Sequence, residues 1–182
     1  MIKIKKLDGR LAAIAEMICG GVIADVGSDH AYLPIWLYLN KKIKKAYALD
    51  ISENCVERIR ANIKKYDITP DIIIPVLSDG LAGLAPLVKG GCRKAAGGSD
   101  EITDIIIAGM GGINIAEILA AAFINVNGAP GSSRPTNLIL QPNSKLKYLR
   151  DFLHENNFDI IQEIKVESKK RFYNIINARL NT

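Results

Sequence analysis

Small, polar and acidic residues directly follow five short apolar segments of this sequence. The five sets are Gly27, Ser28, Asp29 and His30; Asp50; Ser78, Asp79 and Gly80; Gly109, Met110, Gly111 and Gly112; and Gln141, Pro142 and Asn143. Glycines let a ligand approach the backbone, and carboxylates and amides bind hydroxyl and amino groups. Turn-forming glycines and helix-capping aspartates would explain single positions. Their recurrence after all five segments favours a ligand-binding site.

The spacing of Gly27 and Asp50 is typical of a nucleoside site. A carboxylate at the end of the second strand of such a fold accepts hydrogen bonds from both hydroxyls of a ribose. A dinucleotide would require the pattern G-x-G-x-x-G, whereas the sequence from Gly27 reads GSDHAY, with Asp29 in place of the second glycine. That carboxylate would repel phosphates but suits the ammonium or sulfonium of S-adenosylmethionine. The sequence therefore predicts S-adenosylmethionine rather than NAD as the cofactor.

Alternating strand and helix patterns must position these residues. The predicted strands are 22–26, 45–49, 71–77, 102–108 and 137–140, and the predicted helices are 7–18, 31–39, 53–66, 113–123 and 144–156. Pro75 suits a strand at the sheet edge, and we expect Ser52 to cap the helix that follows it. The segments 159–166 and 172–180, separated by Lys169 and Lys170, predict a hairpin.

Five strand–helix units predict a parallel sheet, because parallel strands need crossover connections. The predicted fold class is therefore α/β: a Rossmann-like, doubly wound, mostly parallel seven-stranded sheet with an N-terminal helix and a C-terminal β-hairpin. Ligands bind such sheets at the carboxyl ends of the strands, where the strand order reverses. We expect the five sets of residues to meet at that edge.

The length of 182 residues, 48% of them hydrophobic, fits one domain with a full core. No apolar run approaches the ~18 residues of a membrane-spanning helix, and charged residues interrupt the stretch that a secretory signal would need. Three scattered cysteines (Cys19, Cys55 and Cys92) without a CxxC pair indicate a reducing, cytoplasmic setting and no zinc site. The net charge of +5 permits a nucleic-acid partner but is equally compatible with an enzyme that binds none.

Three longer motifs are more specific than these patterns. They are ADVGSDHAYLP at residues 24–34, IIAGMGG at residues 106–112 and LILQPN at residues 138–143. Together they resemble the bacterial tRNA (adenine-22-N1)-methyltransferase family, within the superfamily of S-adenosylmethionine-dependent methyltransferases. The helix start at residues 7–15 with Arg10, and the late segments 163–166 and 173–176, are also similar, so the resemblance covers nearly the whole chain.

The resemblance implies a seven-stranded Rossmann-like domain that binds S-adenosylmethionine and methylates N1 of an adenine in the D-arm region of tRNA. By position it implies that the cofactor is bound by Arg10, Asp25, Gly27, Ser28, Asp29, His30, Asp50, Ile51, Asp79, Gly80, Ala108, Gly109 and Met110. Asp50 and Ile51 would hold the ribose and pack on the cofactor's adenine. The family carries a further helical segment after the sheet, and we expect residues 1–182 to form a single methyltransferase domain without it.

For the implied reaction, orientation is the main requirement, because adenine N1 already carries a lone pair and needs no deprotonation. The product is cationic, so Asp29 is the first candidate for stabilising the developing charge. A purely cofactor-directed or turn-capping role of Asp29 is the alternative. Gln141 and Asn143 are candidates for binding the adenine edge, since amides combine a donor and an acceptor. For Asn143, capping the following helix is the favoured alternative.

The expected partner is tRNA, and the basic residues Lys3, Lys5, Lys6 and Arg10 are expected nearest to it. We expect no membrane contact, no metal site at Asp25, Asp29 and His30, and a cytoplasmic monomer. Two alternatives remain open at this point. One is a methyltransferase of the same fold that acts on a small molecule. The other is a cofactor-binding protein that does not methylate tRNA.

Overall fold

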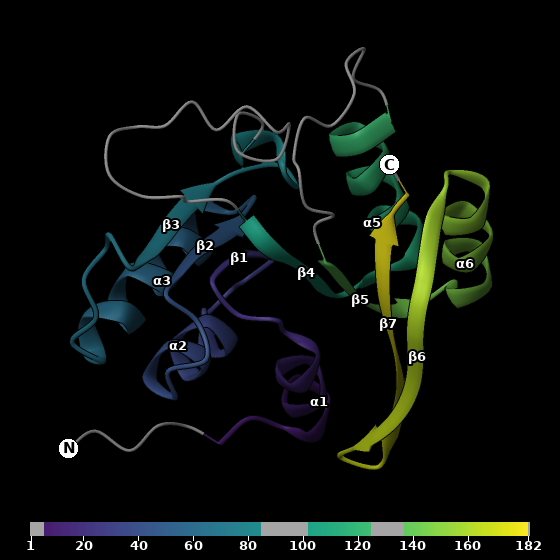
Figure 1. Cartoon of the computed structure of the whole chain (residues 1–182). Helices are drawn as coiled ribbons and strands as arrows, with labels where there is room; N and C mark the ends of the chain where they lie inside the picture. The colour runs from purple at the N-terminus through teal and green to yellow at the C-terminus, as the bar shows by residue number, and fades with distance from the viewer. Residues whose placement is uncertain (1–5, 85–101, 125–136, 182) are drawn as a thin grey trace.

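A seven-stranded sheet in the order β3-β2-β1-β4-β5-β7-β6 forms the centre of the molecule (Figure 1). The computed structural model describes residues 6–84, 102–124 and 137–181. The strands are β1 (Val22–Val26), β2 (Lys45–Asp50), β3 (Ile73–Leu77), β4 (Ile102–Gly111), β5 (Asn137–Ser144), β6 (Phe158–Ser168) and β7 (Arg171–Leu180). Strands β1 to β5 pair in parallel, and β7 pairs antiparallel with both β5 and β6. The predicted fold class is confirmed.

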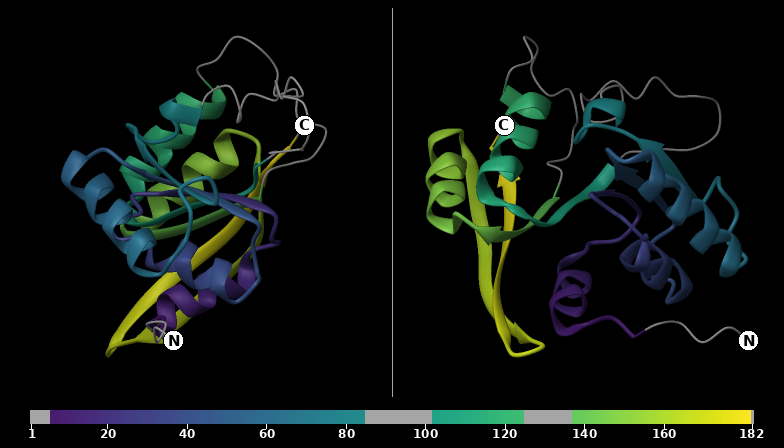
Figure 2. Two further views of the ribbon diagram at one scale, coloured as in Figure 1. Left: turned by 90° about the vertical axis from the view of Figure 1, so that its left-hand side faces the viewer. Right: turned by 180° about the vertical axis from the view of Figure 1, so that it is seen from behind.

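Helices cover both faces of the sheet (Figure 2). They are α1 (Gly9–Met17), α2 (Tyr32–Leu39), α3 (Glu53–Lys65), α5 (Gly112–Leu119) and α6 (Leu146–Glu155), with a 3-10 turn at Ala82–Leu84 and a π-helical turn at Ala120–Ile124. Buried residues of α1, α2 and α3 pack on one face around Ile23 and Ile106, and those of α5 and α6 pack on the other around Ala24 and Ile105. The central strands read as continuous apolar runs because both of their faces are buried.

Strands β4 and β5 continue beyond their predicted ends. They run to Gly111 and Ser144, and their pairing shifts register between Ala108 and Gly111. Gly109 allows this irregularity because its φ is 84°, a left-handed backbone that disfavours residues with a Cβ. Helix α6 consequently begins only at Leu146, and Asn143 lies within the strand. The expectation that Asn143 caps this helix is therefore wrong.

Two smaller predictions about turns have different outcomes. Strand β3 is at the sheet edge, where Pro75 pairs with Ala48, so the edge prediction is confirmed. Ser52 occupies the position before α3 but makes no side-chain cap. Ser52 is thus the N-cap residue of α3, as predicted, but its backbone N–H donates to the Asp50 carboxylate at 3.0 Å and its side chain does not bond the helix.

The C-terminal hairpin is confirmed and is longer than predicted. Strand β5 pairs with β7 only from Asn137 to Leu140, whereas β6 and β7 pair with each other as far as Ser168 and Arg171. The hairpin therefore extends beyond the rest of the sheet as a two-stranded ribbon, with its tip beside α1 (Figure 1). Nζ of Lys169 at the tip lies 3.7 Å from the carboxylate of Asp8, the residue that precedes α1.

Part of the expected basic cluster and one of the three cysteines lie outside the described residues, namely Lys3, Lys5 and Cys92. Lys6 is described and exposed. Within the described parts of the chain, no helix combines the length and the apolar character needed to cross a membrane.

Candidate active site

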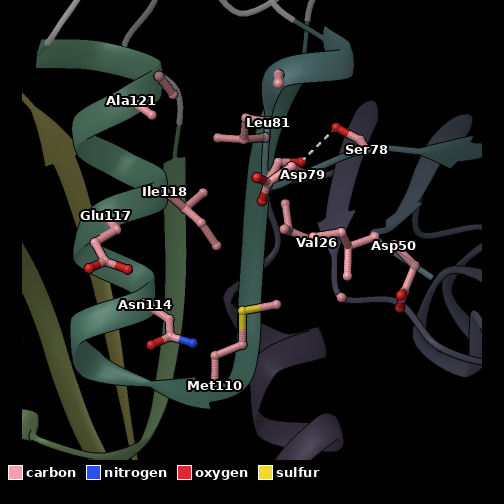
Figure 3. A pocket seen from close by; sticks show the side chains of 15 residues that line it. Val26, Asp50, Ser78, Asp79, Leu81, Met110, Asn114, Glu117, Ile118 and Ala121 are labelled. Carbon is pink, nitrogen blue, oxygen red and sulfur yellow. Dashed lines mark hydrogen bonds between the residues drawn. The ribbon is translucent and has the colours of Figure 1, made fainter.

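A cavity of about 740 Å³ opens where the carboxyl ends of β1 to β4 meet (Figure 3). We call this side of the sheet the carboxyl edge. The cavity is lined by Val26, Gly27, Asp50, Ile51, Ser78, Asp79, Gly80, Leu81, Ala82, Met110, Asn114, Glu117, Ile118, Ala121 and Ala122. Among these are the predicted cofactor residues Gly27, Asp50, Ile51, Asp79, Gly80 and Met110. The volume lies within the range of ligand pockets, about 300–1,000 Å³.

Asp50 ends β2 with a carboxylate whose orientation is set by two backbone groups. The N–H of Asp29 donates to one oxygen at 3.1 Å, and the N–H of Ser52 donates to the other at 3.0 Å. Asp50 is only 9% exposed. A carboxylate has about four acceptor positions, so each oxygen can accept a further hydrogen bond. The group is therefore prepared to bind a pair of hydroxyls, while the neighbouring Ile51, 70% exposed, offers an apolar surface.

The loop after β3 is held by the buried Ser78. Its Oγ donates to the carbonyl of Gly80 at 3.0 Å and accepts from the N–H of Gly83 at 2.9 Å. Gly80 has a φ of 54°, and a Cβ there would come within about 3 Å of the Ile118 side chain on α5. The loop thus passes close to α5 and presents the exposed carboxylate of Asp79 to the cavity.

The turn after β1 brings backbone and side chains into close contact. The N–H groups of Gly27 and Ser28 both donate to the Leu49 carbonyl, each at 2.9 Å. The terminal methyl group of Met110 lies against Gly27, in the space that a Cβ would need. Figure 3 shows the Met110 side chain directed from the end of β4 toward Val26. Met110 thus forms part of the cavity wall at the turn.

A chain of three hydrogen bonds lies on the other side of the end of β4. Nη1 of Arg10 donates to Oε1 of Gln141 at 2.6 Å, and Nε2 of Gln141 donates to Oδ1 of Asn143 at 3.0 Å. Nδ2 of Asn143 then donates to the Gly109 carbonyl at 2.7 Å. We call this the amide chain. Because each donor meets an acceptor, Arg10 determines which way the buried amide of Gln141 points, and Gln141 does the same for Asn143.

Asp25 is a buried carboxylate beside these groups. It accepts a hydrogen bond from Oγ of Ser28 at 2.6 Å. Burial raises the pKa of Asp25 to about 6; the Ser28 hydrogen bond and the Arg10 charge act in the opposite direction, and the Asp50 charge adds to the rise. The ionised form is thus maintained near neutral pH by Ser28 and Arg10.

Asp29 and His30 follow the same turn but do not line the cavity. The Asp29 carboxylate pairs with Nη2 of Arg58 on α3 at 2.8 Å and lies 3.4 Å from Nε2 of His30. The His30 ring stacks on Tyr32, with 5.0 Å between the ring centroids. The structure brings the backbone of Asp29 to Asp50 and its carboxylate to α3. It does not bring Asp29 together with Gln141 and Asn143.

Residues of α5 contribute a wall of the cavity that the sequence analysis missed. Asn114, Glu117 and Ile118 line the cavity from one face of this helix, and Ala121 continues that face in the π-helical turn. Ile118 extends toward Leu81 and Asp79 (Figure 3). Their spacing of three and four residues is a signal that could have identified them. A helix that starts directly after a strand end must present one face to the carboxyl edge. Across residues 6–84, 102–124 and 137–181, no group of three or more His, Cys, Asp and Glu side chains is arranged to hold a metal ion.

This combination of a seven-stranded mixed sheet and a carboxylate-containing cavity at its switch point defines a class of protein. Residues 7–176 match the family described as a methyltransferase domain. The fold and the site are those of this class.

Comparison with individual proteins identifies the family more closely. The tRNA (adenine(22)-N(1))-methyltransferase of Bacillus subtilis (strain 168) is 34% identical over 174 residues, which make up 95% of this chain and 65% of that protein. The crystal structure of the B. subtilis m1A22 tRNA methyltransferase TrmK has a TM-score of 0.78 and 33% identity, over 97% of this chain and 67% of that one. M. capricolum TrmK in complex with S-adenosyl-homocysteine has a TM-score of 0.76 and 30% identity, over 97% of this chain and 70% of that one. The chain belongs to the TrmK-like tRNA (adenine-22-N1)-methyltransferase family and spans about two thirds of the length of these relatives.

Proposed function

We propose that this chain transfers a methyl group from S-adenosylmethionine to N1 of adenine 22 in tRNA. The observation that carries this proposal is the Asp50 carboxylate, oriented by two backbone N–H groups at the rim of a cavity of about 740 Å³. The relative from M. capricolum is in complex with the cofactor product S-adenosyl-homocysteine. The B. subtilis relative is named for the reaction at adenine 22.

The cavity residues fit S-adenosylmethionine. Asp50 would accept the ribose hydroxyls, Ile51 and Leu81 would pack on the purine, and Asp79 would accept a hydrogen bond from its amino group. When bound, S-adenosylmethionine supplies an electrophilic methyl group on a sulfonium cation. All of the predicted cofactor roles stay predictions. Those that fall on residues outside the cavity lining are the roles of Arg10, Asp25, Ser28, Asp29, His30, Ala108 and Gly109.

Asn143 is suited to hold the target adenine without covering the reacting nitrogen. Within the amide chain its Oδ1 has one lone pair left and its Nδ2 has one hydrogen left. An asparagine amide pairs with adenine through N6 and N7, an edge that leaves N1 free. Guanine presents acceptors at both corresponding positions, so the same amide would discriminate against it. Gln141 would then be a positioning residue and Asn143 the residue that contacts the base.

Glu117 is a candidate for stabilising the cationic product. It lines the cavity and has no counter-charge among the ion pairs of the described residues, whereas Asp79, which also lines the cavity, is assigned to the amino group of the cofactor purine. Asp29 stays a candidate for this role, although Arg58 already neutralises its carboxylate at 2.8 Å.

The test of the function is mass-spectrometric mapping of tRNA transcripts incubated with this chain and S-adenosylmethionine. We expect 1-methyladenosine at position 22 and no methylation of a control transcript that carries guanine there. Binding of S-adenosyl-homocysteine without methylation of any tRNA would contradict the proposal. Turnover with a small-molecule pool in place of tRNA would support the small-molecule alternative instead.

The buried Asp25 predicts a pH dependence of cofactor binding. The groups that face its carboxylate are Ser28, Arg10 and Asp50. Because its pKa is about 6, the negative charge beside the cationic cofactor is lost as the pH falls through 6. We expect the affinity for S-adenosylmethionine, measured calorimetrically, to weaken below pH 6. The Asp25→Asn variant should bind the cofactor weakly at every pH, and its affinity should not change as the pH falls through 6.

The same group predicts the pH dependence of stability. The pKa of Asp25 is about 6 in the folded chain and 3.8 as its ordinary value, so between these values the folded state binds more protons than the unfolded state. The free energy of unfolding should therefore fall as the pH rises through this window, by roughly 3 kcal/mol. Urea unfolding at pH 4.5 and 7.5 measures this, and about 2 kcal/mol of the decrease falls between these two pH values. A decrease of equal size in Asp25→Asn would exclude Asp25 as its cause.

A further inference from the structure

The projecting part of the β6–β7 hairpin carries basic and aromatic side chains that no part of the proposed chemistry uses. Its turn consists of Lys169 and Lys170 and is followed by Arg171, and all three are exposed. Phe172 comes next and is 63% exposed, although it is a large apolar residue. Nζ of Lys165 on the paired strand lies 4.8 Å from the centre of the Phe172 ring. We call Lys165 and residues 169–172 the ribbon tip.

The turn residues are unusual for their backbone. Lys169 and Lys170 have φ values of 51° and 61°, the left-handed conformation in which two-residue hairpin turns favour asparagine and glycine. Lysine is disfavoured there because its Cβ crowds the backbone. Backbone preference therefore does not explain why lysines occupy this turn, although Lys41 and Lys145 adopt the same conformation elsewhere in the chain.

The ribbon tip lies at the same edge of the sheet as the amide chain. Arg10 links the two, because its guanidinium stands over the Tyr173 ring at 5.7 Å while Nη1 binds Gln141. Ile176 pairs with Leu140, the residue before Gln141, and the strand continues from there to Arg171. At a rise of about 3.3 Å per residue, the tip reaches roughly 17 Å beyond Leu140.

The charge balance at the tip is positive. Glu167, across from Phe172, is exposed, and Asp8 lies 3.7 Å from Lys169. Glu163 is already paired with Arg150 on α6, at 2.6 Å. Lys165, Lys169, Lys170 and Arg171 therefore outnumber the acidic groups beside them. Cations next to an exposed aromatic ring are the combination that binds phosphates and stacks an unpaired base.

We propose that the ribbon tip is a docking surface for the tRNA, in which Lys169, Lys170 and Arg171 bind backbone phosphates and an unpaired base stacks on Phe172. This inference rests on the proposed function, since it needs an RNA whose target base reaches Asn143. An acidic protein partner would satisfy the lysines and Arg171 but would leave the exposed Phe172 without a role.

Two variants of the full chain test the surface by binding to an unmodified tRNA transcript at several salt concentrations. The triple variant Lys169→Ala/Lys170→Ala/Arg171→Ala should weaken binding at least about tenfold and reduce the slope of log affinity against log salt by about 2 to 3. Phe172→Ala should weaken binding about tenfold and leave the salt slope unchanged. The matched control is Lys44→Ala/Lys64→Ala/Lys65→Ala, which removes the same charge from exposed positions at the opposite, amino edge of the sheet. We expect this control to keep most of the affinity and the salt slope.

The outcome separates this inference from the proposed function. If the triple variant had the same tRNA affinity and the same salt slope as the control, the proposed docking surface would be wrong, whether or not the tRNA is methylated. Absence of methylation by the unaltered chain would overturn the function, while the binding measurement would still report on the surface. Affinity for S-adenosyl-homocysteine and the thermal midpoint should be unchanged in all variants, which excludes misfolding as the cause.

Discussion

Replacing Asp50 with asparagine should weaken binding of S-adenosyl-homocysteine about 100-fold. The asparagine amide has a single acceptor oxygen, so one of the two backbone N–H groups that orient Asp50 would face an NH2 group. The ribose would also lose charge-assisted hydrogen bonds, each worth about 1.5–3 kcal/mol. A 100-fold loss corresponds to about 2.7 kcal/mol. Isothermal titration calorimetry measures the effect directly.

The control for this experiment is Asp71→Asn, which makes the same chemical change at an exposed position before β3. We expect its affinity to equal that of the unaltered chain. Asp79→Asn should lose about tenfold, because we assign a single hydrogen bond to that carboxylate. If Asp79→Asn abolished binding while Asp50→Asn kept it, the ribose would have to be assigned to the loop after β3.

Changing Gln141 to glutamate should reduce kcat for tRNA methylation about 100-fold and leave the affinity for S-adenosyl-homocysteine within about twofold. Glutamate keeps the size of Gln141 and the contact with Arg10 but offers no N–H to Oδ1 of Asn143. The Asn143 amide would then turn over, and its oxygen would face the Gly109 carbonyl. The Asn143 amide would then present its donor to adenine N6 and its acceptor to N7, the reverse of what adenine binds. N1 would no longer be held in line for methyl transfer.

The matched control is Gln162→Glu, the same change at an exposed position on the outer strand β6, where no effect on kcat is expected. Single-turnover rates at saturating tRNA and cofactor separate the chemical step from binding. A Gln141→Glu variant that lost cofactor affinity and kept its single-turnover rate would show that the amide chain serves the cofactor and not the base.

The sheet could be predicted because its signals are local. The apolar runs at Val22–Val26 and Ile102–Ala108 are strands buried on both faces, and such runs can be recognised without knowing their neighbours. Asp50 could be identified for the same reason, since it directly follows the apolar end of β2. The Met110 position in the cavity could also be identified, since Met110 directly follows the apolar run and lies in the last residues of β4.

The partners of the polar side chains could not be predicted, because they come from distant parts of the chain. Arg10 and Gln141 are 131 positions apart, and they meet because α1 packs against the hairpin strands β6 and β7, the second of which pairs with β5. Asp29 was expected to serve the reaction, but Arg58 on α3 provides its carboxylate with an ion-pair partner. The cap expected from Asn143 failed because β5 continues through it, an extension set by pairing with β4 and not by the residues themselves.

Gly109 and Met110 are consecutive residues, yet they belong to different halves of the site. The Gly109 carbonyl accepts from Asn143, whereas the Met110 side chain lies against Gly27 in the cavity wall. A Cβ at position 109 would come 3.2 Å from Nη1 of Arg10, at a φ of 84°. In the proposed function, one peptide unit would therefore set the separation between the wall of the cofactor cavity and the residue that contacts the target adenine. The spacing of the two substrates would then be built into the β4 backbone.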